Sequence, residues 1–138
     1  MEQNNNMELI FRKARKSDIS NIVKMLADDE LGSKREDYKI PPPKSYYDAY
    51  QNIFQDKNQE LIILENFNKE IIGTLQLTFI QYLTHRGGLR AQIEAVRIQR
   101  KFRGKGFGKS IFKWAIKRSI DKVAHLVQLT TDKRDLMR

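Results

Sequence analysis

The sequence predicts one α/β domain, with a mixed sheet flanked by helices. Runs of strand periodicity alternate along the chain with runs of helical periodicity. One strand-like run, 92–99, leads directly into a glycine-containing loop and then into an amphipathic helix. The chain has 138 residues, 40% hydrophobic and 31% charged, which suits an ordinary globular protein with one core. We therefore expect a single domain over residues 7–138, preceded by a polar tail at residues 1–6.

The first half of the chain has the pattern of one strand and two helices. Residues 8–13 predict a strand. Ser17 and Asp18 are expected to begin a helix as its N-cap and first-turn acid, because apolar residues follow at helical spacing. The polar segment 28–44 contains three prolines near its end, which predicts a long loop or a short helical turn. A second helix is expected at residues 45–55.

The second half begins with a hairpin and continues with a strand, a helix and a closing strand. Residues 61–65 and 71–80 are predicted to pair across a short turn. The closing strand is expected at residues 126–130. The helix after the glycine loop has an apolar face made of Ile111, Phe112, Ala115, Ile116 and Ile120.

The strand before the glycine loop changes its hydrophobic register between Ala95 and Val96. Before this point the apolar residues occupy odd positions, and after it they occupy even ones. Because side chains alternate between the two faces of a strand, the change indicates a β-bulge, which separates the strand from its neighbour. A strand buried on both faces is the alternative, and it needs no bulge.

The loop that follows has the composition of a phosphate-binding site. Residues 103–108 read Arg-Gly-Lys-Gly-Phe-Gly, so the backbone can turn sharply and bring several N–H groups together at a helix N-terminus. Residues 97–118 contain nine Lys or Arg and no Asp or Glu, and the net charge of the whole chain is +9. The excess positive charge is therefore local to this loop and helix.

Two common phosphate motifs do not fit this loop. A Walker A loop that ends at Lys109 and Ser110 would need glycine at position 103, where the chain has Arg103. The dinucleotide-binding fingerprint fails because Lys109 and Ile111 stand where it requires glycine.

The remaining pattern resembles the pyrophosphate loop of the GCN5-related N-acetyltransferase (GNAT) superfamily, Gln/Arg-x-x-Gly-x-Gly/Ala. The matching residues are Arg103, Gly106 and Gly108. The resemblance is to a bacterial subgroup and covers nearly the whole chain in the same order. Its further segments are residues 26–29, 73–77, 93–98 and 126–133.

This resemblance implies a fold, a reaction and an acyl donor. The fold is a central twisted mixed sheet flanked by helices. The reaction is direct transfer of an acetyl group from acetyl-CoA to an amine, in a ternary complex. The pantetheine arm would insert beside the bulge, and the pyrophosphate would lie on the loop. The donor-binding residues expected on this basis are Val96, Arg97, Ile98, Arg103, Gly104, Lys105, Gly106, Phe107, Gly108 and Lys109.

Glu94 is the candidate general base. It is the only acidic residue between Gly73 and Asp121, and it lies at the predicted bulge. An alkylammonium has a pKa of about 10.4, so the amine must lose a proton before it attacks, and a carboxylate can accept that proton. An ion pair with Arg90 or another basic neighbour is the alternative role. The backbone N–H of Val96 is the candidate donor to the oxyanion.

The sequence departs from the family's pattern near its C-terminus. Family members continue after residues 130–133 with a helix that carries a Phe-Tyr motif and with further strands, whereas this sequence stops at Arg138. A shortened CoA-binding or dimeric protein with little catalysis is therefore the alternative to an enzyme. We expect a homodimer that covers the last strand, since exposed edges invite pairing. The amine, a small molecule or a peptide, is expected to dock at residues 28–50.

Composition argues against several other classes of protein. The absence of cysteine excludes disulfides and thiolate nucleophiles. His85 and His125 are far apart in the sequence, so no metal site is expected. No apolar run is long enough for a membrane span and no signal peptide is evident, so we expect a cytoplasmic protein without a membrane partner. Nucleic-acid binding would suit the basic residues, but their confinement to one loop and helix argues against it.

Overall fold

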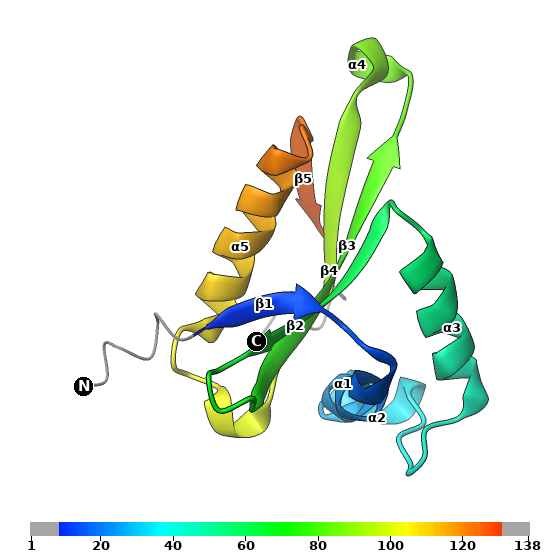
Figure 1. Ribbon diagram of the computed structural model, residues 1–138, viewed down its shortest axis with the longest axis vertical. Coiled ribbons are helices and arrows are strands. Elements are labelled where there is room, and N and C mark those ends of the chain that lie inside the picture. Colours follow the sequence, from blue (N-terminus) through cyan, green and yellow to red (C-terminus); the bar gives the residue numbers. More distant parts are fainter. Residues whose placement is uncertain (1–8, 131–138) are drawn as a thin grey trace.

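The computed structural model describes residues 9–130, which form one five-stranded sheet with helices on both faces (Figure 1). The strands lie in the order β1-β2-β3-β4-β5, and all neighbours are antiparallel except the parallel pair β4 and β5. The predicted α/β class with a mixed sheet is confirmed. The predicted tail at residues 1–6 lies outside the described residues.

The elements follow the predicted order closely. The strands are β1 (Ile10–Lys13), β2 (Gln59–Glu65), β3 (Ile71–Gln81), β4 (Leu89–Ile98) and β5 (Leu126–Leu129). The α-helices are α1 (Ile19–Ala27), α2 (Glu30–Arg35), α3 (Lys44–Gln55), α4 (Thr84–Gly87) and α5 (Phe107–Asp121). Two 3-10 turns, η2 (Lys16–Asp18) and η3 (Arg100–Phe102), precede α1 and the glycine loop.

Each face of the sheet has its own hydrophobic core. Ile111 and Ala115 of α5 pack against buried side chains of β2, β3 and β4 on one face. On the other face, α1 packs with Ile63 of β2 and with the tyrosines of α3. The helices α1, α2 and α3 therefore lie opposite α5, as Figure 1 shows. None of the helices in residues 9–130 has both the length and the apolar character needed to cross a membrane.

The start of α1 differs from the predicted cap. Ser17 lies inside η2, and Asp18 precedes α1 without capping it through its side chain. The Asp18 carboxylate is buried and instead accepts hydrogen bonds from the Arg12 guanidinium at 2.7 Å and from the Arg15 N–H at 2.7 Å. Arg12 also pairs with Glu65 of β2. This network attaches the start of α1 to the edge of the sheet.

The predicted β-bulge is present in β4. Thr74 of β3 pairs with Arg97, and Gln76 pairs with Glu94, so two residues of β4 stand opposite one residue of β3. Ala95 adopts a left-handed backbone with φ of 56°. The extra residue explains the change of register, since apolar side chains on both sides of the bulge reach the same core beneath α5. It also places Glu94 and Arg97 on one face, although they are three residues apart.

Candidate active site

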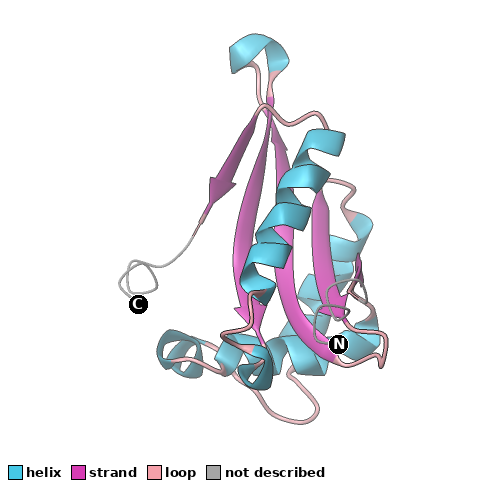
Figure 2. Ribbon diagram, turned by 90° about the vertical axis from the view of Figure 1, so that its left-hand side faces the viewer, coloured by secondary structure: helices cyan, strands magenta, loops and turns pink. Residues whose placement is uncertain are grey.

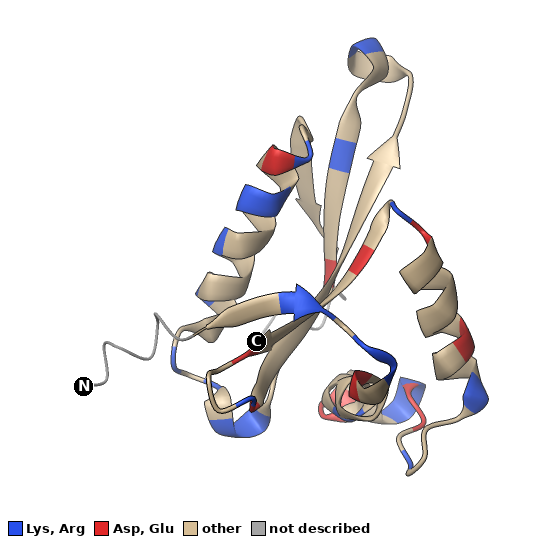
Figure 3. Cartoon of the chain, viewed as in Figure 1, with Lys and Arg blue, Asp and Glu red and all other residues tan. Residues whose placement is uncertain are grey.

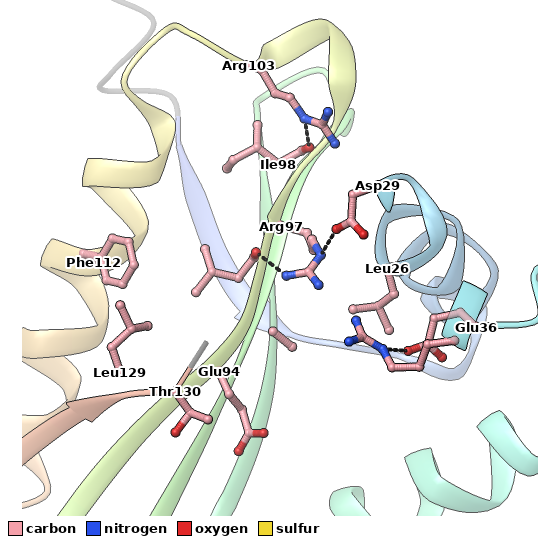
Figure 4. Close-up of a pocket in the computed structure, with 13 residues that line it drawn as sticks. Leu26, Asp29, Glu36, Glu94, Arg97, Ile98, Arg103, Phe112, Leu129 and Thr130 are labelled. Atoms are coloured by element: carbon pink, nitrogen blue, oxygen red, sulfur yellow. Dashed lines mark hydrogen bonds and ion pairs between the residues drawn. The ribbon is translucent and has the colours of Figure 1, made fainter. Parts of the chain in front are cut away.

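A cleft opens where β4 and β5 part. Their parallel pairing ends at Ile93 and Leu129, and the remaining residues of β4, 94–98, have no partner on β5. Figure 2 shows β5 diverging from its neighbour toward its C-terminal end. The cleft has a volume of about 880 Å³ and is lined by β4, β5, α5, Arg103 and the α1–α2 region (Figure 4). Because the two strands separate here, a ligand can enter beside the edge of β4 that β5 leaves uncovered.

Glu94 lines this cleft and remains available for chemistry. Its carboxylate accepts one hydrogen bond, from Gln92 Nε2 at 3.1 Å, and forms no ion pair with residues 9–130. The alternative partner Arg90 places its guanidinium 5.4 Å from the centre of the Tyr82 ring instead. Figure 4 shows Glu94 and Thr130 close together at the mouth between the two strands.

Arg97 lines the same cleft but turns toward the α1–α2 wall. Its Nε lies 3.3 Å from Asp29 Oδ2, and its Nη1 donates to the Val96 carbonyl at 2.9 Å (Figure 4). Its side chain is therefore held between the bulge and α2. Of the predicted donor-binding residues, Val96, Arg97, Ile98 and Arg103 line the cleft together with Glu94.

Arg103 is held at the edge of the cleft by the end of β4 and by α1. Its Nε donates to the Ile98 carbonyl at 3.0 Å, and its Nη2 lies 3.5 Å from Asp28 Oδ2. Asp28 also pairs with Arg100, and the hydrogen bond from the Arg100 side chain lowers the pKa of the Asp28 carboxyl. Arg103, which was expected to bind phosphate, is thus partly neutralised by the Asp28 carboxylate.

The glycine loop itself is open on its outer side. Gly104 and Gly106 have φ of 75° and 87°, and Gly106 immediately precedes α5. A Cβ atom placed on Gly104, Gly106 or Gly108 would meet no atom within 4 Å. A ligand can therefore approach the backbone closely here, at the N-terminus of a 15-residue helix.

Most of the local positive charge is neutralised by acids from other parts of the chain. Six of the nine cations in residues 97–118 form ion pairs, with Asp28, Asp29, Glu60, Glu70 and Asp121. Within residues 9–130, three of them form none: Lys105, Lys109 and Lys113. These lysines lie in the glycine loop and the first two turns of α5, where Figure 3 shows blue along the helix. Within residues 97–118, the positive charge without an ion pair is therefore that of the loop and the start of α5.

Lys105 and Phe107 face a second, smaller pocket. It has a volume of about 180 Å³ and lies beside the β2–β3 turn. The loop thus borders two hollows, with Arg103 on the large cleft and Lys105 on the small one.

The two histidines meet at the far end of β4. The rings of His85 and His125 have centroids 4.9 Å apart, and Tyr82 contacts the His125 ring nitrogen. Their separation in the sequence therefore does not persist in the fold. Within residues 9–130, no group of three His, Cys, Asp or Glu residues could hold a metal ion.

The side chains that sequence patterns missed come from the α1–α2 region. Asp29, Arg35 and Glu36 line the cleft and fall within the segment 28–50 that was expected to bind the amine. Arg35 pairs with the adjacent Glu36, but Asp29 and Glu36 also have partners on other elements, which no local pattern indicates. Glu36, for example, accepts a hydrogen bond from the Tyr46 hydroxyl at 2.8 Å.

Comparison with known proteins matches most of the chain to one family. Residues 23–136 match the model of the Acetyltransferase (GNAT) family. A crystal structure of a transcriptional regulator from Bacillus halodurans C-125 is 48% identical, with a TM-score of 0.86 over 91% of this chain and 83% of that chain. No curated protein shows significant similarity to the sequence.

Two further solved structures are similar in fold. A GNAT family acetyltransferase from Staphylococcus aureus is 25% identical, with a TM-score of 0.72 over 93% of this chain and 90% of that chain. A predicted acetyltransferase from Clostridium acetobutylicum, solved with acetyl-CoA, is 22% identical, with a TM-score of 0.69 over 91% and 82% of the two chains.

Proposed function

Because the chain belongs to the acetyltransferase (GNAT) family, we propose that it transfers an acetyl group from acetyl-CoA to an amine. Family membership supports acyl transfer in general. The observation that carries the more specific proposal is the coincidence of open glycines, a helix N-terminus and unpaired lysines in the loop that directly follows Arg103, which lines the cleft. These features suit a diphosphate whose attached arm enters between β4 and β5.

The residues present fit this donor. The backbone N–H groups after Gly106 and the side chains of Lys105 and Lys109 would hold the phosphates. On the side of β5, the edge of β4 at residues 94–98 has no strand partner within residues 9–130 and offers backbone groups to the arm. Acetyl-CoA, when bound, supplies a thioester, an acyl group that is already activated for attack by nitrogen.

Glu94 would accept the proton that the amine loses, directly or through a water molecule. The nitrogen forms a bond to the acyl carbon, and the carbon–sulfur bond breaks. The Val96 N–H would stabilise the negative charge that develops on the carbonyl oxygen. The thiolate that leaves has a basicity near that of cysteine, whose thiol has a pKa of about 8.5, and can take a proton from solvent.

Calorimetry with acetyl-CoA, followed by turnover assays with a panel of amines, tests the proposal. We expect binding that weakens with salt and turnover with at least one amine. Glu94→Gln should lower kcat by about 10²-fold and leave acetyl-CoA affinity unchanged. Asp56→Asn, at a carboxylate that follows α3 and does not line the cleft, is the control. A wild-type protein that binds no acetyl-CoA would refute the proposal.

The description of the Bacillus halodurans relative as a transcriptional regulator raises DNA binding as a second candidate. Three unpaired lysines on one loop and helix are few for tracking a duplex backbone. A gel-shift assay at low and physiological salt distinguishes the two functions. We expect only weak binding that disappears at physiological salt, whereas tight binding there would favour the second candidate.

A further inference from the structure

We propose that Gln92 is a positioning residue for Glu94, an inference that rests on the proposed function. Gln92 Nε2 donates to Glu94 Oε1 at 3.1 Å. The two residues lie on the same face of β4, since they pair with Thr78 and Gln76, which are two positions apart on β3. The contact therefore follows from the regular part of the strand, just before the bulge.

Glu94 has little else to fix its side chain. Within residues 9–130, Gln92 is the one side chain that hydrogen-bonds to its carboxylate. Arg97 shares its face but is occupied by Asp29 and by the Val96 carbonyl. A flexible, partly exposed carboxylate samples several rotamers, and a charge-assisted hydrogen bond selects one of them.

The geometry leaves one carboxylate oxygen for the reaction. Gln92 engages Oε1, so Oε2 can face the amine or a bridging water molecule. A base that is held in this way loses less entropy when it meets the reacting nitrogen. Removal of the amide should therefore reduce kcat while leaving the donor-binding end of the cleft unchanged.

Gln76 provides a matched control on the neighbouring strand. Gln76 is the register partner of Glu94 and lies on the same face of the sheet. It therefore offers the same type of side chain as Gln92, also next to Glu94. Its Nε2, however, donates to Gln59 Oε1 at 2.8 Å. A substitution there changes the same chemical group without touching the hydrogen bond to Glu94.

The experiment compares Gln92→Met with Gln76→Met, because Met has a similar length and lacks the amide. Gln92→Met should lower kcat by about tenfold, with the KM for acetyl-CoA within about twofold of wild type. Gln76→Met should retain the wild-type kcat. In a Glu94→Gln background, Gln92→Met should cause no further loss, because its effect passes through the carboxylate.

Two results would overturn the inference while leaving the proposed function intact. One is a Gln92→Met enzyme as fast as Gln76→Met, in an assay where Glu94→Gln is slow. The other is an equal loss from Gln92→Met in both backgrounds, which would show that it acts independently of Glu94. A wild-type protein that is inactive with every amine would instead refute the proposed function, and this inference with it.

Discussion

Arg97 Nε lies 3.3 Å from Asp29 Oδ2, and this contact joins the bulged strand β4 to the residue that precedes α2. The Asp29 side chain also accepts a hydrogen bond from the Gly32 N–H and so caps α2. One carboxylate thus fixes the wall of the cleft and keeps a guanidinium turned away from Glu94, its neighbour on the same strand face.

Loss of the contact between Asp29 and Arg97 should slow the reaction. Asp29→Asn keeps a good helix cap but removes the charge, so Arg97 becomes free to pair with Glu94. We expect kcat to fall by about tenfold, because a paired carboxylate is a weaker base. Steady-state assays check this, and Asp29→Asn combined with Arg97→Gln should turn over as fast as Arg97→Gln alone. A double variant as slow as Asp29→Asn would contradict the explanation.

The bulge predicts opposite effects of glycine at two alanines of β4. Ala95 has a positive φ, which costs about 1 kcal/mol for a residue with a Cβ atom. Ala95→Gly should therefore raise the free energy of unfolding by about 0.5–1 kcal/mol. Ala91, fully buried in the regular part of the strand, is the control, and Ala91→Gly should lower it by about 1 kcal/mol. Urea denaturation measures both.

A third prediction separates charge from backbone strain in the glycine loop. Gly106→Asp should abolish acetyl-CoA binding in calorimetry, because it places a negative charge where phosphate must approach. Gly106→Asn has the same size and tolerates the positive φ better, so it should retain measurable affinity. Equal loss in both variants would point to side-chain bulk or strain rather than charge.

The Asp18 network predicts a pH dependence of stability. Burial opposes ionisation of Asp18, but hydrogen bonds from the Arg12 side chain and the Arg15 N–H lower its pKa below the usual value. Because the folded-state pKa lies below the unfolded one, the stabilisation is present above about pH 3.9 and is lost as pH falls through the folded-state pKa.

Asp18→Asn should therefore lower the free energy of unfolding by about 2 kcal/mol at neutral pH. The difference from wild type should shrink at pH values below about 3.9. Urea titrations at several pH values measure it, with Asp48→Asn as an exposed control that costs under about 1 kcal/mol. A difference that is constant with pH would contradict the role of ionisation.

The homodimer remains a prediction, and the structure suggests where to test it. Exposed apolar side chains follow the C-terminal half of α5 and continue onto β5, with Ile120 65% and Val123 81% exposed. If a second copy covers this surface, Ile120→Lys should shift sedimentation toward the monomer. Phe54→Lys, an equally exposed site on α3, should have no effect. A monomeric wild-type protein would refute the prediction.

Local patterns predicted the elements and the bulge because their causes are local. The register change between Ala95 and Val96 is a property of one strand, and the structure reproduces it in that place. The hairpin and the helix after the glycine loop also follow from periodicity within short segments. The predicted apolar face of that helix was right at Ile111, Phe112 and Ala115 and wrong at Ile116 and Ile120, which are exposed. The predicted cap at Ser17 was wrong because the neighbouring Asp18 bonds to Arg12, whose other partner, Glu65, is 53 residues away in the sequence.

The cleft was only partly predictable because some of its side chains depend on partners that are distant in the sequence. Glu94 could be selected from its position in the strand. Asp28 and Asp29 could not, because their roles depend on arginines about 70 residues away in the sequence. Single-sequence patterns carry no information about which distant charges meet, so five of the six cation pairings emerged only in the fold; the sixth, Lys117 with Asp121, is a local i,i+4 pair on α5.

Because of that pairing, the place where an anionic ligand is attracted depends on which cations the acids leave unneutralised. Acids that follow α1 or lie on β2, α5 and the β2–β3 turn pair with six of the nine cations in residues 97–118. The three cations of this stretch that form no ion pair within residues 9–130 lie in the loop and the first two turns of α5. Loss of one such acid, Glu70 for instance, would free Lys101 to attract an anionic ligand away from the loop. A mutation that touches no part of the cleft could then slow the capture of an anionic ligand.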